Sequence, residues 1–238
     1  MLTSPNNDKV KYWQKLNIKK YRDKEKLFLV EDEHLVNEAI EKNIVKEIIT
    51  IDDNIKLDVP VYYVSENIMK ILSNQVTSAK IIAVCQFLEE KEINGNILVL
   101  DNLQDPGNLG TIIRSAVAFN FDTIVLSKTS VDLYNPKVIR ASEGMIFNIN
   151  IIRRDITLFL NNLDKSYTKI TTNVVNGKDI KDIRFDKCAI VIGNEGNGVS
   201  KEIDCICDER VYIKMNSMCE SLNAGVTASI LMYEVNHV

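Results

Sequence analysis

Short apolar runs alternate with amphipathic stretches along most of the chain. The runs that we expect to form strands are residues 27–30, 45–51, 61–64, 81–85, 97–100, 123–126, 149–152, 169–172 and 189–192. Apolar residues at helical spacing predict helices over 33–43 and 111–120, and a helix that begins at 136. Strands that alternate with helices predict an α/β fold with a mostly parallel sheet covered on both faces.

The chain changes character near residue 90. Segment 89–96 is polar and ends in the turn-forming sequence Asn94-Gly95-Asn96. A chain of 238 residues is long enough for one large domain or two small ones. We therefore expect a small α/β domain over residues 1–92 and a second domain over residues 93–238.

The composition is that of an ordinary globular protein, with 45% hydrophobic and 26% charged residues. No apolar run approaches the ~18–20 residues of a membrane span, and the polar N-terminus lacks a secretory signal pattern. Five cysteines without a dense framework predict reduced thiols. These features favour an intracellular, cytoplasmic protein that is not embedded in a membrane.

The charge is distributed unevenly. The formal net charge of −4 argues against a general nucleic-acid coat, which is usually basic. Residues 1–30, however, carry eight basic and three acidic side chains, so this stretch is +5 and the other 208 residues are −9. Apolar and aromatic side chains interleave with the lysines near helical spacing, at Tyr12, Trp13, Leu16 and Tyr21. The stretch is either a solvated amphipathic helix or a phosphate-facing patch with rings for stacking.

Three polar loops follow predicted strands, where ligands bind in parallel α/β sheets. The first spans residues 101–114. Gly107 and Gly110 permit a tight turn from strand to helix, and Asn108 could cap that helix. Arg114 falls about one turn into the helix and could project toward a ligand over its N-terminus. The alternative is a structural turn with a surface arginine.

The second loop spans residues 191–200 and contains Gly193, Gly196 and Gly198. Such a loop can present backbone N–H groups to a ligand. It is not a P-loop, because the Lys-Ser/Thr pair is missing, and it is not G-x-G-x-x-G. Glu195 is either a ligand contact or a carboxylate that interacts with a helix dipole.

The third loop leads from a short strand at 211 into a helix. Ser221 is a natural N-cap, whereas Asn223 and Glu220 are less easily explained by capping. The helix that follows carries small residues that permit close packing against another helix, namely Ala224, Gly225, Ala228 and Ser229.

Few kinds of catalytic chemistry fit these loops. The two histidines, His34 and His237, lie outside them, which argues against a Ser-His-Asp hydrolase. Cys205 and Cys207 lack a second pair at zinc spacing, so we expect no metal. Cys219 is a weak candidate nucleophile. The remaining polar side chains suit the positioning of a polar, partly anionic substrate.

Together the three loops resemble the motifs of the SpoU/TrmH family of RNA ribose 2′-O-methyltransferases, within the SPOUT superfamily. The matching residues are Asn108, Gly110 and Arg114 for N-x-G-x-x-x-R, Gly193, Glu195 and Gly198 for G-x-E-x-x-G, and Ser221, Leu222 and Asn223 for S-L-N. Segment 140–144 resembles the family's sequence between the first two motifs. Residues 1–90 resemble the ribosomal-protein-like recognition domain of many members, mainly at 28–31 and in the helix that follows.

The resemblance implies methylation of a ribose 2′-hydroxyl in structured RNA, with ribosomal RNA favoured over transfer RNA. It also implies a deep trefoil knot in the second domain, S-adenosylmethionine bound there, and a homodimer. The implied cofactor-binding residues are Thr172, Gly193, Asn194, Gly198, Ile213, Met215 and Leu222. The implied catalytic residues are Arg114, Asn108, Glu195, Ser221 and Asn223. The basic residues expected to bind RNA are Lys15, Lys19, Lys20 and Arg22.

Three positions differ from the family pattern. Lys214 stands where the family usually has Pro, Ser217 where it has Gly, and Asp32 where it has Gly. The role that the resemblance implies for Arg114 is that of the base that removes the proton of the ribose 2′-hydroxyl. A guanidinium has a pKa above ~12, so we favour its orienting the hydroxyl or the adjacent phosphate. The competing interpretations are a nucleotide-dependent oxidoreductase and a non-catalytic RNA-binding protein with the same fold.

Overall fold

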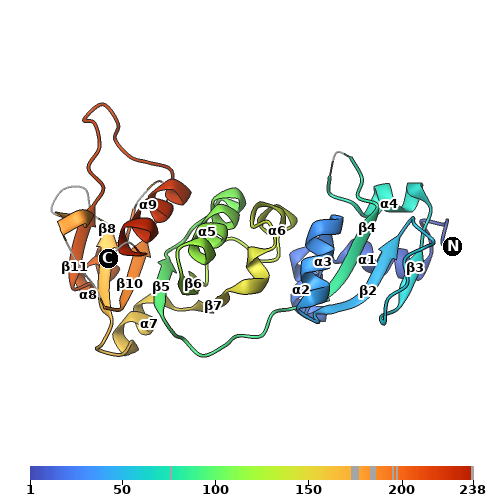
Figure 1. Cartoon of the computed structure of the whole chain (residues 1–238), viewed down its shortest axis with the longest axis horizontal. Coiled ribbons are helices and arrows are strands. Elements are labelled where there is room, and N and C mark those ends of the chain that lie inside the picture. Colours follow the sequence, from blue (N-terminus) through green and yellow to red (C-terminus); the bar gives the residue numbers. More distant parts are fainter. Residues whose placement is uncertain (76, 173–176, 183–185, 195, 197, 237–238) are drawn as a thin grey trace. The chain divides into compact units, whose positions relative to one another are not determined.

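The chain forms two compact units in a computed structural model that describes residues 1–75, 77–172, 177–182, 186–194, 196 and 198–236 (Figure 1). The first unit comprises Met1–Glu89 and Asp132–Phe147, and the second comprises Glu90–Val131 and Asn148–Val238. The sequence predicts one crossing between domains near residue 92. In the structure the chain leaves the second unit again after Val131 and returns to it at Asn148.

The first unit is built on a four-stranded mixed sheet with the order β1-β4-β2-β3. Its strands are β1 (Leu27–Glu31), β2 (Val45–Thr50), β3 (Val61–Tyr63) and β4 (Ile81–Gln86). β4 runs antiparallel to β1 and β2, whereas β2 and β3 are parallel. Its helices are α1 (Asp8–Lys15), α2 (Lys19–Glu25), α3 (Glu33–Glu41), α4 (Glu66–Leu72) and α6 (Pro136–Ala141).

The basic N-terminal stretch forms two helices, and their inner faces are buried. Trp13 has no exposed surface, and its Nε1–H donates a hydrogen bond of 2.8 Å to the Glu47 carboxylate. Lys9 forms a 2.6 Å ion pair with the same carboxylate. α1 and α2 are two separate helices because Ile18, the N-cap of α2, has an extended backbone. Trp13 is therefore a core residue, and the prediction that it is available for stacking on RNA is wrong.

Arg22 is also buried, with 4% of its surface exposed. Its guanidinium donates to the Leu16 carbonyl at 2.8 Å and to the Asp132 carboxylate at 2.5 Å. The prediction that Arg22 contacts RNA phosphates is therefore wrong, because a buried side chain with a carboxylate partner cannot also face solvent. The exposed basic residues of the two helices are Lys11, Lys15, Lys19, Lys20 and Lys24.

Segment 132–147 belongs to the first unit through specific contacts. The Tyr134 ring stacks on Phe87 with centroids 4.0 Å apart, and its hydroxyl accepts a 2.8 Å hydrogen bond from the Leu88 N–H. Gly144 has a φ of +81° and lies against Glu38 of α3. The 140–144 sequence, which resembles a segment of the methyltransferase motif region, is therefore packed in the first unit.

The second unit contains a seven-stranded sheet with the order β7-β6-β5-β10-β8-β11-β9. Its strands are β5 (Asn96–Leu100), β6 (Phe121–Ser127), β7 (Asn150–Arg154), β8 (Thr168–Thr172), β9 (Lys178–Asp179), β10 (Cys188–Ile192) and β11 (Glu209–Tyr212). Every pairing described between these strands is parallel. In β10, Ile190 is in register with Leu98 and Ile170. The prediction of a mostly parallel sheet is confirmed.

Helices cover both faces of this sheet. α7 (Ile156–Asn162) and α8 (Lys201–Ile206) pack against one face, where Ile156 and Ile203 join a core with Val99 and Val191. Successive side chains of a strand point to opposite faces of the sheet. The buried strand residues that alternate with those of this core therefore line the second face. There α5 (Pro106–Ala118) and α9 (Ala224–Asn236) lie side by side (Figure 1).

Candidate functional site

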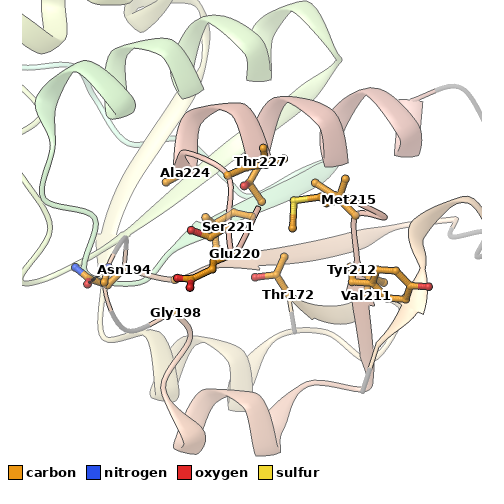
Figure 2. A pocket seen from close by; sticks show the side chains of 15 residues that line it. Thr172, Asn194, Gly198, Val211, Tyr212, Met215, Glu220, Ser221, Ala224 and Thr227 are labelled. Atoms are coloured by element: carbon orange, nitrogen blue, oxygen red, sulfur yellow. Dashed lines mark hydrogen bonds between the residues drawn. The ribbon is translucent and has the colours of Figure 1, made fainter. Parts of the chain in front are cut away.

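A cavity of about 380 Å³ lies where β8, β10 and β11 end (Figure 2). Its lining includes all seven residues expected to bind the cofactor, namely Thr172, Gly193, Asn194, Gly198, Ile213, Met215 and Leu222. The structure adds lining residues outside that expected set, among them Gly196, Tyr212, Glu220 and Thr227. These residues lie at or just beyond the carboxyl end of a parallel strand, in the segment that leads into α9, or in the first turn of α9.

Two glycines shape one wall of this cavity. A Cβ on Gly193 would lie 2.0 Å from the carbonyl carbon of Gly198, so only glycine fits there. Asn194 and Gly198 pair through two backbone hydrogen bonds of 3.0 and 2.9 Å and lie together in Figure 2. Gly198 has a φ of +65°, in the left-handed region that favours glycine. Backbone hydrogen bonds therefore hold the two ends of the second motif close together.

The cavity lining combines apolar side chains with a few polar groups and one carboxylate, that of Glu220. Ile192, Val211 and Leu222 supply apolar surface, while Thr172 and Asn194 supply hydrogen-bonding groups. Cofactor sites commonly have this composition, with few polar groups that fix orientation in a mostly apolar pocket. The lining suits a ligand that has both apolar and polar parts.

The helix of the first motif, α5, begins before residue 111, where the sequence predicts its start. α5 starts at Pro106, and its N-cap is Asp105, whose side chain accepts a 2.7 Å hydrogen bond from the Asn108 N–H. The prediction that Asn108 caps this helix is wrong. An N-cap residue followed by Pro at the first helical position is a known start signal, and Asp105-Pro106 is that pair.

The residue that caps α9, the helix after the third motif, also differs from the one that the sequence predicts. The Asn223 side-chain oxygen accepts hydrogen bonds from the backbone N–H groups of Gly225 at 2.9 Å and Val226 at 3.3 Å. Asn223 therefore caps α9, and the prediction that Ser221 does so is wrong. Ser221 instead lines the cavity, with its side chain drawn toward it in Figure 2.

Helices α5 and α9 bring two motifs together. The Asn223 Nδ2 donates a 2.9 Å hydrogen bond to the Asn108 Oδ1. Farther along the same pair of helices, the Ser115 and Ser229 hydroxyls are 2.7 Å apart. Gly225 lies in this contact, since a Cβ added there would lie 3.6 Å from the Asn108 Oδ1 and the Thr111 Cβ of α5, an ordinary van der Waals distance.

The remaining expected catalytic residues occupy different positions. Arg114 lies exposed on α5 and is not part of the cavity lining. Glu195 falls outside the described residues. The structure thus joins Asn108 to Asn223 and places Ser221 at the cavity, while Arg114 lies on the helix that carries Asn108.

Asp101, directly after β5, is a polar residue that sequence reasoning passed over. It is half-buried, and burial raises the pKa of its carboxyl, while the nearby Ser200 backbone N–H opposes that shift. In the described part of the chain, His, Cys, Asp and Glu form no group of three suited to a metal ion. None of the described helices is both long and apolar enough to span a membrane.

Comparisons with known proteins cover both units. The SpoU rRNA Methylase family model matches residues 95–233, and the MRM3-like substrate binding domain matches residues 7–83. Over 243 aligned residues the chain is 36% identical to the 23S rRNA (guanosine(2553)-2′-O)-methyltransferase RlmP of Bacillus subtilis, and the match covers 98% of both chains.

Solved structures share the fold. An RNA 2′-O ribose methyltransferase is similar with a TM-score of 0.83 and 27% identity, over 98% of this chain and 96% of that one. An S-adenosylmethionine-bound rRNA methyltransferase from Sinorhizobium meliloti has a TM-score of 0.89 at 23% identity, over 98% and 95% of the two chains. The SpoU methyltransferase AviRb from Streptomyces viridochromogenes, also with that cofactor, has a TM-score of 0.87 at 22% identity, over 98% of each chain.

Proposed function

Because the chain belongs to the SpoU rRNA methylase family, we propose that it transfers a methyl group from S-adenosylmethionine to a ribose 2′-hydroxyl in ribosomal RNA. The observation that carries this proposal is the cavity, where residues of the second and third motifs meet beside the Asn108–Asn223 hydrogen bond. The family match argues against the competing oxidoreductase, and the convergence of motif residues on one cavity argues against a non-catalytic RNA-binding protein.

The residues that we expect to hold the cofactor are those that line the cavity. The backbone of Gly193 and Gly198 and the side chains of Thr172 and Asn194 would supply polar contacts, and Ile213, Met215 and Leu222 would supply apolar ones. When bound, the cofactor supplies an electrophilic sulfonium methyl group. The protein's own contribution is to align a ribose hydroxyl with it, since orientation alone lowers a barrier substantially.

Arg114 is the residue that we propose orients the hydroxyl or its neighbouring phosphate. Its side chain is exposed, so it is accessible to an RNA strand, and its planar guanidinium matches a phosphate through two parallel hydrogen bonds. Asn108, Ser221 and Asn223 would complete the reacting centre through hydrogen bonds to the ribose. Glu195 remains a candidate from its motif.

Substitution of Arg114 by Lys tests this role. Lysine keeps the positive charge but loses the paired donors, so we expect turnover to fall at least about tenfold while cofactor affinity is unchanged. Single-turnover methyl transfer and cofactor titration measure the two quantities. Turnover near that of the wild type would exclude any role that needs the guanidinium geometry.

The first unit is the part that we propose recognises RNA, through the exposed lysines of α1 and α2. A transfer RNA is the alternative substrate. We also propose a cytoplasmic homodimer whose second unit contains a trefoil knot. α9 supports the dimer, because Val226 and Tyr233 are each 46% exposed on a helix that also packs on α5.

The deciding experiment measures transfer of tritiated methyl groups from S-adenosylmethionine to ribosomal and transfer RNA. We expect label in ribosomal RNA at one ribose, mapped by resistance of the 3′-linkage to alkaline hydrolysis. Label in transfer RNA would favour the alternative substrate. Calorimetry that detects NAD but not S-adenosylmethionine would favour an oxidoreductase, and binding of neither would leave a non-catalytic RNA-binding protein.

A further inference from the structure

A carboxylate lines the cofactor cavity. Of the lining residues that the structure describes, Glu220 alone carries a charged side chain. It is exposed, and no hydrogen bond or ion pair joins its carboxylate to another described residue. The other polar side chains of this lining are hydroxyls and an amide. A carboxylate with no protein cation beside it attracts a positively charged group of a ligand.

Glu220 lies toward one end of the cavity. Figure 2 shows its side chain beside that of Ser221 and on the same side as Asn194, whereas Val211 and Tyr212 line the opposite end. Ser221 belongs to the third motif, which is part of the proposed reacting centre. The end that contains Glu220 is therefore the one at which we expect the methyl group to be transferred.

The backbone is held on both sides of Glu220. Before it, the Cys219 N–H donates to the Asn216 carbonyl at 3.0 Å, which closes a turn. After it, Asn223 caps α9 and donates a 2.9 Å hydrogen bond to Asn108 of α5. Glu220 thus stands between two fixed points, close in sequence to the side chain that joins the third motif to the first.

We infer that Glu220 is a specificity-determining residue whose carboxylate favours the positively charged sulfonium of S-adenosylmethionine over the neutral sulfide of S-adenosylhomocysteine. The inference deepens the proposed function and rests on it for the identity of the ligand. The two ligands share the adenosine, the amino group and the carboxylate, and they differ by one methyl group and one positive charge. Specificity is a difference between two affinities, so a charge that attracts only one of these ligands sets the preference.

The same preference promotes exchange of product for substrate. Transfer of the methyl group to the ribose oxygen, with loss of the hydroxyl proton, leaves a neutral sulfide in the cavity. The attraction to Glu220 therefore ends with the reaction, and the product is held less tightly than the substrate. Because the attraction is strongest before transfer, Glu220 adds binding energy without lowering the chemical barrier.

The test uses the variant Glu220→Gln, which keeps the size of the side chain and removes its charge. We expect the Kd for S-adenosylmethionine to rise about tenfold, while that for S-adenosylhomocysteine stays within about twofold of the wild type. Sinefungin, an analogue with an ammonium-bearing carbon in place of the sulfonium, should lose affinity as S-adenosylmethionine does. Calorimetry measures all three constants. Single-turnover methyl transfer at saturating cofactor should be no slower than about half the wild-type rate.

Glu92→Gln is the matched control. Glu92 is exposed in the same unit and precedes β5, so it lies toward the amino ends of the parallel strands, away from the cavity at their carboxyl ends. The variant has the same change in charge, and we expect it to keep the wild-type Kd for each ligand. An equal loss of S-adenosylmethionine affinity in the two variants would show that total charge matters, which would overturn the inference.

The three ligands separate this inference from the proposed function. If Glu220→Gln weakens all of them equally, the carboxylate contacts a group that they share, and the inference is wrong while the proposed function stands. Unchanged affinities for all three would refute it in the same way. If the wild type binds neither S-adenosylmethionine nor S-adenosylhomocysteine, the proposed function itself fails, and the inference fails with it.

Discussion

At the scale of the residue, the glycines of the second motif have distinct roles. Gly193 lies where any side chain would collide with the Gly198 backbone, and Gly198 has a left-handed backbone with open space where a Cβ would lie. Gly196 has no such constraint, because the nearest atom to a Cβ added there, the Asn194 Oδ1, is 3.4 Å away. Steric exclusion therefore makes position 193 the least tolerant of the three.

The substitution Gly193→Ala should separate the two backbone segments of the loop, because the obstructing atoms are backbone and cannot rotate away. We expect a loss of about 1–3 kcal/mol in the free energy of unfolding and at least about a tenfold rise in the cofactor Kd. Gly196→Ala, the control in the same loop, should change stability by less than about 0.5 kcal/mol. Equal effects of the two substitutions on the Kd would contradict this explanation.

At the scale of the element, α9 begins at a residue that also contacts another helix. Asn223 caps α9 with its side-chain oxygen and donates to Asn108 of α5 with its side-chain nitrogen. One amide thus sets where the helix starts and how it meets its neighbour. For α5, the cap is a separate residue, Asp105.

Two substitutions separate the roles of Asn223. Asn223→Ala removes the cap and should cost about 1 kcal/mol of stability together with most of the activity. Asn223→Asp still accepts the N-terminal hydrogen bonds but cannot donate to Asn108, so we expect near-wild-type stability with turnover reduced by about a hundredfold. Thermal unfolding and methyl-transfer assays measure these effects. An aspartate variant with full turnover would show that capping is the only function of this side chain.

At the scale of the whole molecule, positive charge is gathered at the N-terminal end of the chain. The +5 of residues 1–30 becomes an exposed set of lysines once Arg22 is buried against Asp132 and Lys9 is paired with Glu47. The other 208 residues, at −9, include the whole methyltransferase unit, and their net negative charge opposes the approach of a polyanion. The net charge of −4 is therefore an average over two unlike parts of the chain.

Reversal of Lys15, Lys19 and Lys20 to Glu should weaken RNA binding at least about tenfold at low salt and make its salt dependence shallower, because fewer counterions are released. The cofactor Kd should not change. A control with the same charge change reverses Lys42, Lys46 and Lys70, exposed lysines elsewhere in the first unit. Filter binding over a range of salt concentrations measures both triple variants, and equal losses would show that total charge matters rather than this surface.

Local pattern was enough to place most strands and the three motifs. Apolar runs predicted the longer strands of both sheets, with differences of one or two residues at their ends, because burial of a strand requires consecutive apolar side chains. The two-residue strand β9 has no apolar run and was missed. Gly193 and Gly198 were recognisable because a close backbone approach at the first and a left-handed backbone at the second both favour glycine. The family resemblance followed from these same residues.

Tertiary contacts decided what local pattern left open. Arg22 is neutralised by Asp132, 110 residues away, and Asn108 is joined to Asn223, 115 residues away. A basic side chain in a lysine-rich helix looks exposed until its distant partner is known. In the same way, segment 132–147 follows a strand of the second unit but packs in the first. Side-chain chemistry and spacing determined which elements form and where the motifs lie, whereas partners distant in sequence determined which polar groups face solvent or the cavity.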